Sequence, residues 1–134
     1  MSHFTHIKTL FQNLFYLEKA LNHLNITFKR QEKITENSNL YDINLIIPQL
    51  NGYDIEFAWN GQEYEIVVDM SFWEQSSPIE SFVDKIAQQY AGEVIIGESQ
   101  KMGFQPIKYS QNMDGSNTLI LERWNNQKAM ERTV

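Results

Sequence analysis

The stretch YDIEFAWNGQEYEIVV, residues 53–68, decides the fold. Apolar and polar residues alternate on both sides of Asn60-Gly61, which is the pattern of two half-buried strands. The Asn-Gly pair readily adopts the positive φ angles that a tight hairpin turn requires. The stretch therefore predicts an antiparallel β-hairpin.

A two-residue turn at Asn60-Gly61 would set the register of this hairpin. Phe57 would then lie opposite Tyr64 on the apolar face, and Glu56 would lie opposite Glu65 on the other. Directly opposed like charges destabilise a strand pair by up to about 1 kcal/mol. The predicted acidic face consists of Asp54, Glu56, Glu63 and Glu65. In this register Glu63 would lie opposite Ala58.

We interpret this acidic face, together with Trp59 beside the turn, as a surface for an unidentified protein partner. Clustered carboxylates can dock a basic protein or bind a divalent cation. Exposed tryptophans often anchor partners. The spacing of a calcium-binding loop is absent, so we predict no metal site, and the alternative is a solvated face whose charges point into water.

Two helices are expected on either side of the hairpin. Leucines recur at helical spacing over residues 10–24, with Asn13 as the N-cap. Ser77-Pro78 followed by Glu80 predicts the start of a second helix, which we extend to Met102 with Gly103 as its stop. A strand around residues 93–97 is the alternative to the end of that helix.

The remaining pattern completes an α+β class, with an antiparallel sheet and two main helices packed on one face. Residues 30–41 are polar and are expected to form a loop. One domain is expected over residues 1–124, and a flexible tail over residues 125–134. The strands are expected at 4–9, 26–29, 43–47, 53–59, 64–68, 104–110 and 118–124.

Composition excludes several functions. The chain has no cysteine, which rules out disulfides and thiolate chemistry. A net charge of −6 argues against nucleic-acid binding, and no apolar run is long enough to span a membrane. Phosphate-binding, nucleophile-elbow and zinc-protease motifs are absent, so we predict no catalytic residue and no cofactor. These patterns do not define an oligomeric state.

A second hypothesis places a small-ligand site or an enzyme site near His3 and Asp69. Asp69 could orient the imidazole for acid–base chemistry. His3 and His6 are spaced so that a strand would point them to opposite faces, which argues against a shared metal site.

Several short segments, in order along nearly the whole chain, carry a family resemblance. They are Met1-Ser2-His3-Phe4-Thr5, Ile7-Lys8-Thr9, Gly52-Tyr53-Asp54-Ile55, Gln89-Tyr90-Ala91, Gly103-Phe104, Asp114-Gly115-Ser116 and Leu121-Glu122-Arg123-Trp124. Together they resemble the hypothetical chloroplast reading frame thirty-five family of cyanobacteria and algal plastids, a domain of unknown function.

The resemblance implies a location in the plastid, in the chloroplast stroma, or in the cytoplasm of a cyanobacterium. It also implies a helix after Tyr90, and it brings no catalytic residues. We therefore expect a non-enzymatic accessory or protein-interaction factor rather than an enzyme.

Overall fold

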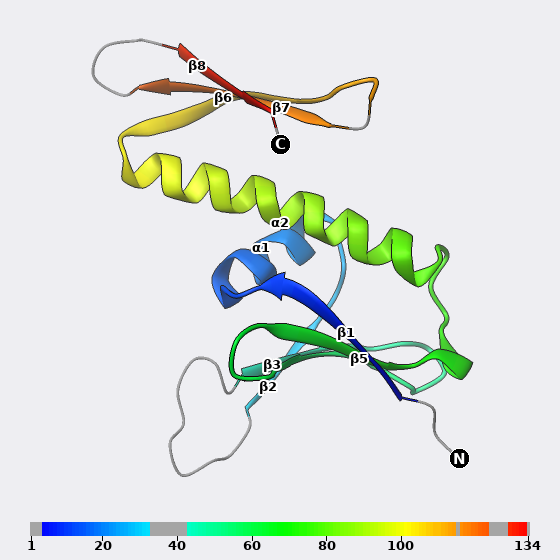
Figure 1. Cartoon of the computed structure of the whole chain (residues 1–134). Helices are drawn as coiled ribbons and strands as arrows, with labels where there is room; N and C mark the ends of the chain where they lie inside the picture. The colour runs from blue at the N-terminus through cyan, green and yellow to red at the C-terminus, as the bar shows by residue number, and fades with distance from the viewer. Residues whose placement is uncertain (1–3, 33–42, 115, 124–128, 134) are drawn as a thin grey trace. The chain divides into compact units, whose positions relative to one another are not determined.

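Two units, Met1–Ala87 and Gln88–Val134, make up the chain in the computed structural model (Figure 1). The structure describes residues 4–32, 43–114, 116–123 and 129–133. The first unit contains a five-stranded sheet and the second a three-stranded sheet. The predicted α+β class, with an antiparallel sheet and two main helices, is confirmed.

The sheet of the first unit is antiparallel throughout. Its strands lie in the order β1-β5-β4-β3-β2. Figure 1 shows α1 (Leu14–His23) on one face of it. A short 3-10 helix, η2 (Met70–Phe72), leads from β5 toward α2 (Ile79–Lys101). The strand bounds are β1 Phe4–Phe11, β2 Lys29–Glu32, β3 Ile43–Ile47, β4 Ile55–Trp59 and β5 Tyr64–Asp69.

The core of the first unit follows from the alternation that predicted the strands. Side chains on the helix-covered face are buried, and α1 contributes a stripe at helical spacing. Burying such side chains contributes roughly 1.5–3 kcal/mol each. The fully buried residues are Leu17, Ala20, Leu21, Leu45, Ile55, Phe57, Tyr64, Ile66, Val68 and Ile86.

The start of α1 is partly as predicted. The side chain of Asn13 accepts from the N–H of Tyr16 at 3.1 Å, so Asn13 is the N-cap. Leu10, however, is exposed and belongs to β1, which runs on to Phe11. The predicted N-cap is therefore confirmed, and Leu10 fits the helical period only by coincidence.

The strand after α1 begins later than predicted. We expected a strand over residues 26–29 and a loop from Arg30, but β2 spans Lys29–Glu32. Its side chains are exposed, so it lacks the apolar alternation that reveals a strand. Backbone pairing with β3 and the Arg30–Glu18 ion pair, at 2.6 Å, hold it in place. The rest of the predicted loop, residues 33–41, lies outside the described residues.

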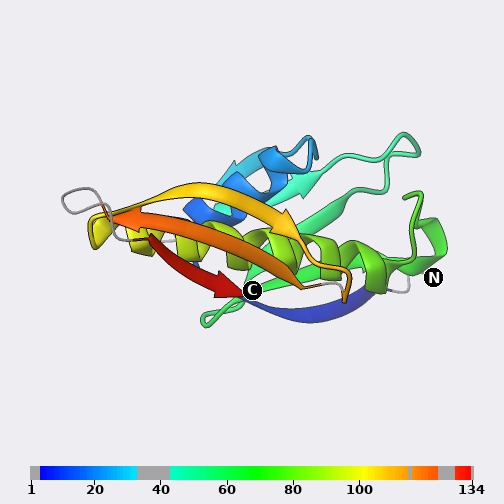
Figure 2. The same ribbon diagram turned by 90° about the horizontal axis from the view of Figure 1, so that it is seen from above.

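The second unit joins the end of α2 to three antiparallel strands, in the order β6-β7-β8 (Figure 2). These strands span Phe104–Gln111, Asn117–Arg123 and Ala129–Thr133. Their core is Phe104, Leu119 and Leu121, against which Ile95 and Ile96 of α2 pack. The helical interpretation of residues 93–97 is thus confirmed, and α2 stops before Gly103, whose φ is 87°.

The predicted C-terminal tail differs from what the structure describes. Residues Ala129–Thr133 form β8, which pairs with β7. The polar composition of this segment gave no strand signal, since edge strands are held chiefly by backbone hydrogen bonds. Residues 124–128 and 134 lie outside the described residues.

Candidate functional site

The loop that joins β4 to β5 is longer than the predicted two-residue turn. The backbone N–H of Asn60 donates to the carbonyl of Glu63 at 3.0 Å. The side-chain oxygen of Asn60 accepts from the N–H groups of Gln62 and Glu63, each at 2.9 Å. Gly61 supplies the positive φ, at 102°. Asn60 therefore closes the loop onto Glu63 rather than turning the chain in two residues.

The register of the hairpin shifts as a result. Glu56 lies opposite Val67, and Glu65 lies opposite Ala58. The predicted pairings of Glu56 with Glu65 and of Ala58 with Glu63 are therefore wrong. The predicted pairing of Phe57 with Tyr64 is also wrong, because Phe57 lies opposite Ile66. Because side chains alternate with a period of two, the shift of two residues leaves Glu56 and Glu65 on the same, outer face of the sheet.

Each of these two carboxylates has its own polar partner. Glu56 accepts a hydrogen bond from the side-chain amide of Asn44 at 2.8 Å. Glu65 accepts one from the amide of Asn60 at 3.0 Å and contacts Nδ1 of His6 at 3.3 Å. The Asn60 hydrogen bond, with a smaller contribution from His6, lowers the pKa of Glu65. The outer face thus holds partnered carboxylates.

The other predicted partner-binding residues lie elsewhere. Asp54 belongs to the β3–β4 loop, where its carboxylate accepts from the N–H of Gln49 at 3.1 Å. Glu63 is largely buried in the β4–β5 loop. Trp59 alternates onto the other face and meets Tyr64 edge-on, with ring centroids 5.1 Å apart. The structure therefore brings only Glu56 and Glu65 together.

Asp69 has a structural role. Its side chain is buried and accepts from the N–H of Ser71 at 3.0 Å, which caps η2. Within the described ranges no group of three or more His, Cys, Asp or Glu side chains could hold a metal ion. His3 lies outside the described residues, so a joint His3–Asp69 site stays a prediction.

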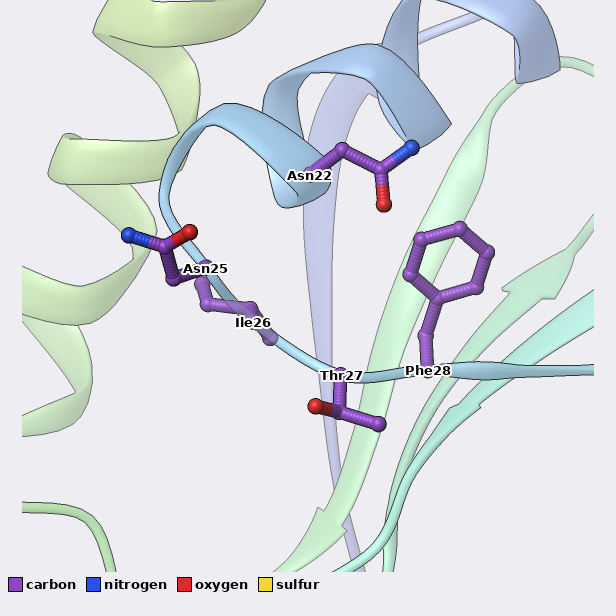
Figure 3. Close-up of a pocket in the computed structure, with 5 residues that line it drawn as sticks. All are labelled: Asn22, Asn25, Ile26, Thr27 and Phe28. Atoms are coloured by element: carbon purple, nitrogen blue, oxygen red, sulfur yellow. The ribbon is translucent and has the colours of Figure 1, made fainter.

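A hollow of about 460 Å³ opens where α1 ends. Five neutral residues line it: Asn22, Asn25, Ile26, Thr27 and Phe28. In Figure 3 the side chains of Asn22 and Phe28 point toward the same space, and Thr27 points away from it. Amides and hydroxyls can hydrogen-bond a ligand, but none of these groups can act as an acid or base near neutral pH. These five side chains can therefore hydrogen-bond a ligand but cannot transfer a proton to it or from it.

A buried glutamine that sequence analysis missed joins two loops of the first unit. The side-chain nitrogen of Gln49 donates to the carbonyl oxygens of Tyr53 and Phe72, the latter at 3.1 Å. Its side-chain oxygen accepts from the N–H of Glu74 at 2.8 Å. The β3–β4 loop is therefore fastened to the segment that follows β5. A polar residue just after Pro48 gave no signal of this role.

Two exposed aromatic rings lie on these joined loops. Tyr53 and Phe72 stack with ring centroids 3.7 Å apart and planes 4° from parallel. Tyr53 is 48% exposed and Phe72 is 38% exposed. We call this pair the aromatic platform. Sequence analysis missed it because it placed Tyr53 in a strand, whereas β4 begins at Ile55.

Charge is unevenly distributed along the chain. Residues 34–84 contain ten Asp and Glu and neither Lys nor Arg, whereas the rest contains seven acidic and eleven basic residues. We call residues 34–84 the acidic segment. It includes β3, β4, β5, η2 and the first turns of α2. This asymmetry could have been found by counting charges in windows along the sequence.

Among the described residues no helix is both long enough and apolar enough to cross a membrane. The fold and the site define a small α+β protein with an acidic segment and an exposed aromatic pair. Residues 20–120 match the family described as "Protein of unknown function (DUF1257)", and the chain belongs to that family.

Relatives named "Uncharacterized protein ycf35" extend the match. The protein from Trieres chinensis is 69% identical over 88% of this chain and 94% of its own length. Those from Guillardia theta and Pyropia yezoensis are 38% and 40% identical, over 92% and 93% of this chain and 98% and 99% of their own. No solved structure matches the chain. The resemblance to a hypothetical chloroplast reading frame family, which is a family of algal plastid genomes, is confirmed.

Proposed function

We propose that this chain is a non-enzymatic protein-interaction factor of the chloroplast stroma, which binds a positively charged protein through its acidic segment. The observation that carries the proposal is the charge distribution, with ten carboxylates and no Lys or Arg over residues 34–84. An excess of one sign of charge attracts a partner of the opposite sign and suppresses others.

The outer face of the sheet supplies part of this surface, where Glu65 of β5 lies opposite Lys8 of β1. Glu56 and Glu65 share it, and both are held by hydrogen bonds from asparagine side chains. The hydrogen bond from Asn60 lowers the pKa of Glu65 and so favours its charged form. Fixed, charged carboxylates favour docking, because less side-chain freedom is lost on binding.

The stroma is proposed on electrostatic grounds. A chain with a net charge of −6 is repelled by anionic membrane surfaces, which recruit basic segments. Fractionation of plastids should therefore recover the chain with the soluble stromal proteins at low salt.

Affinity capture from plastid extract tests the interaction. The double variant Glu56→Lys with Glu65→Lys should lose the partner, because it changes the charge of the outer face by four units. The double variant Glu98→Lys with Glu122→Lys changes the net charge equally in the second unit and should retain the partner. Recovery should fall as salt rises.

A milder pair separates charge from folding. Glu56→Gln with Glu65→Gln keeps hydrogen-bonding groups and removes only the charges, so circular dichroism should match the wild type while partner recovery falls. The proposal fails if these variants recover the same partners as the wild type, or if the wild type recovers none above the level of a charge-matched control protein.

A further inference from the structure

We propose that the aromatic platform binds an arginine side chain of the positively charged partner, an inference that rests on the function proposed above. The platform would stack on the guanidinium plane, and the carboxylates of Asp54 and Glu74, on the same two loops, would receive its N–H donors.

The platform is held in place before any partner arrives. The side-chain nitrogen of Gln49 donates hydrogen bonds to the carbonyl oxygens of both Tyr53 and Phe72. The side-chain amide of Asn51 donates to the Phe72 carbonyl at 2.9 Å, and its oxygen accepts from the N–H of Tyr53 at 3.0 Å. The backbone of Tyr53 and the backbone of Phe72 are thus each hydrogen-bonded to the side chains of Gln49 and Asn51. A preorganised site loses less conformational entropy on binding.

The two rings are too exposed for their stacking to be explained as packing within the hydrophobic core. Tyr53 and Phe72 bury one ring face against each other and leave about half and over a third of their surfaces in water. The same two segments also expose Leu50, at 103%, and Met70. Exposed apolar groups that cluster in this way mark interaction sites.

The charges around the platform select a cation. Asp54 and Glu74 are exposed, and the structure gives each one backbone hydrogen bond, from Gln49 at 3.1 Å and from Asn51 at 3.2 Å. A carboxylate has about four acceptor positions, so each can receive further donors. No Lys or Arg lies within residues 34–84 to compete for them in the sequence.

Arginine fits this combination better than lysine does. Its planar guanidinium stacks on aromatic rings and presents several donors to carboxylates at once. A lysine ammonium is a compact and strongly hydrated charge that uses the ring surface less well. The platform should therefore discriminate between two peptides that have equal charge.

Calorimetric titration of the full chain with three octapeptides tests this discrimination. The peptides alternate glycine with arginine, with lysine or with glutamate. We expect the arginine peptide to bind about threefold or more tighter than the lysine peptide, and the glutamate peptide not to bind. Equal affinity for the arginine and lysine peptides would overturn the proposal.

Variants locate the binding. Tyr53→Ala should weaken arginine-peptide binding by about two- to fivefold, which is the size of an exposed cation–π contact. Tyr53→Phe should bind like the wild type, because it keeps the ring. Glu74→Gln should also weaken binding, whereas Glu80→Gln, which changes another exposed carboxylate of the acidic segment, should weaken it less. Phe15→Ala is the matched control, since that exposed ring lies beside Lys19 at 5.0 Å and should not attract a cation.

The remaining outcomes separate this inference from the proposed function. If the arginine peptide binds but responds only to Glu56→Gln with Glu65→Gln, the platform is not the site and the proposed function stands. If no basic peptide binds the wild type, both proposals fail. If sedimentation shows a self-association that Tyr53→Ala abolishes, the platform is occupied by a second copy and the inference is overturned.

Discussion

The two Asn-Gly loops of the first unit have the same local chemistry and different surroundings. In each loop the asparagine side chain accepts from the backbone N–H two residues on, at 3.0 Å for Asn51 and 2.9 Å for Asn60. In each the glycine has a positive φ, 82° at Gly52 and 102° at Gly61. The β4–β5 loop, residues 60–63, closes on itself through Asn60 and Glu63, whereas the β3–β4 loop, residues 48–54, is fastened to a distant segment by Gln49.

The difference teaches that a turn motif determines a local bend and not the role of the loop. Residues 60–63 satisfy their own backbone groups and serve mainly to reverse the chain. Residues 48–54 depend on groups more than twenty positions away, and in return they hold Tyr53 against Phe72 at the surface. A loop that is rigid without being buried is the usual setting for a binding site.

Removal of the Gln49 side chain should have the largest effect, because this side chain makes the contacts that distinguish the β3–β4 loop from the β4–β5 loop. Gln49→Leu removes the hydrogen bonds of Gln49 to the carbonyls of Tyr53 and Phe72 and to the N–H of Glu74, although Phe72 keeps its bond from Asn51. Each lost hydrogen bond contributes about 1 kcal/mol. We expect the free energy of unfolding to fall by about 3 kcal/mol. Urea unfolding measures it, and a loss below about 1 kcal/mol would show that Gln49 does not fasten the loop.

Replacement of either glycine by alanine should test the feature that the two loops share, which is a glycine with a positive φ. Both Gly52→Ala and Gly61→Ala force a side chain into a positive φ, although neither new Cβ would meet a neighbour within 4 Å. We expect each to lower the free energy of unfolding by about 1–2 kcal/mol through backbone strain alone. Thermal unfolding would contradict this if the two losses differed by more than about 1 kcal/mol.

The smallest expected effect is a change in the pKa of Glu65 when Asn60 is replaced. Its pKa lies below the ordinary value, chiefly because Asn60 donates to it. Asn60→Ala should move that pKa back toward the ordinary value, whereas Asn51→Ala should leave it where it is. A carbon-13 NMR titration of the side-chain carboxyl follows both, and an unchanged pKa in Asn60→Ala would show that another group sets it.

The same substitution has a defined pH dependence. Since the folded pKa of Glu65 is lowered, its contribution to stability is present above the unfolded pKa and is lost as pH falls through the folded one. Asn60→Ala should therefore make unfolding less sensitive to acid below about pH 4.5. Equal acid sensitivity of the variant and the wild type would contradict this linkage.

Sequence patterns predicted the parts of this fold that depend on local period. The alternation over residues 43–47 and 64–68 gave β3 and β5, and the helix expected up to Met102 is α2 within one or two residues at each end. The start of α2 is one position late, because the carbonyl of Pro78 accepts from the N–H of Phe82. These elements bury a periodic face, so their signal lies in adjacent residues.

The parts that failed depend on backbone pairing or on distant contacts. β2 and β8 are polar strands, held by the strands beside them rather than by an apolar face. The hairpin register depended on one side chain, Asn60, which turned a two-residue loop into a longer one. The role of Gln49 could not be read from its own neighbourhood, because Phe72 approaches it only in the folded chain.

A nitrogen-15 NMR titration of the wild-type chain with the arginine–glycine octapeptide tests the central claim most directly. It compares the two Asn-Gly loops in a single sample. We predict that the amide signals of residues 49–54 and of Phe72 shift progressively and saturate, while those of residues 60–63 stay within the scatter of the second unit. Shifts that are equal at both loops, or larger at residues 60–63, would contradict the claim that the aromatic platform is the binding surface.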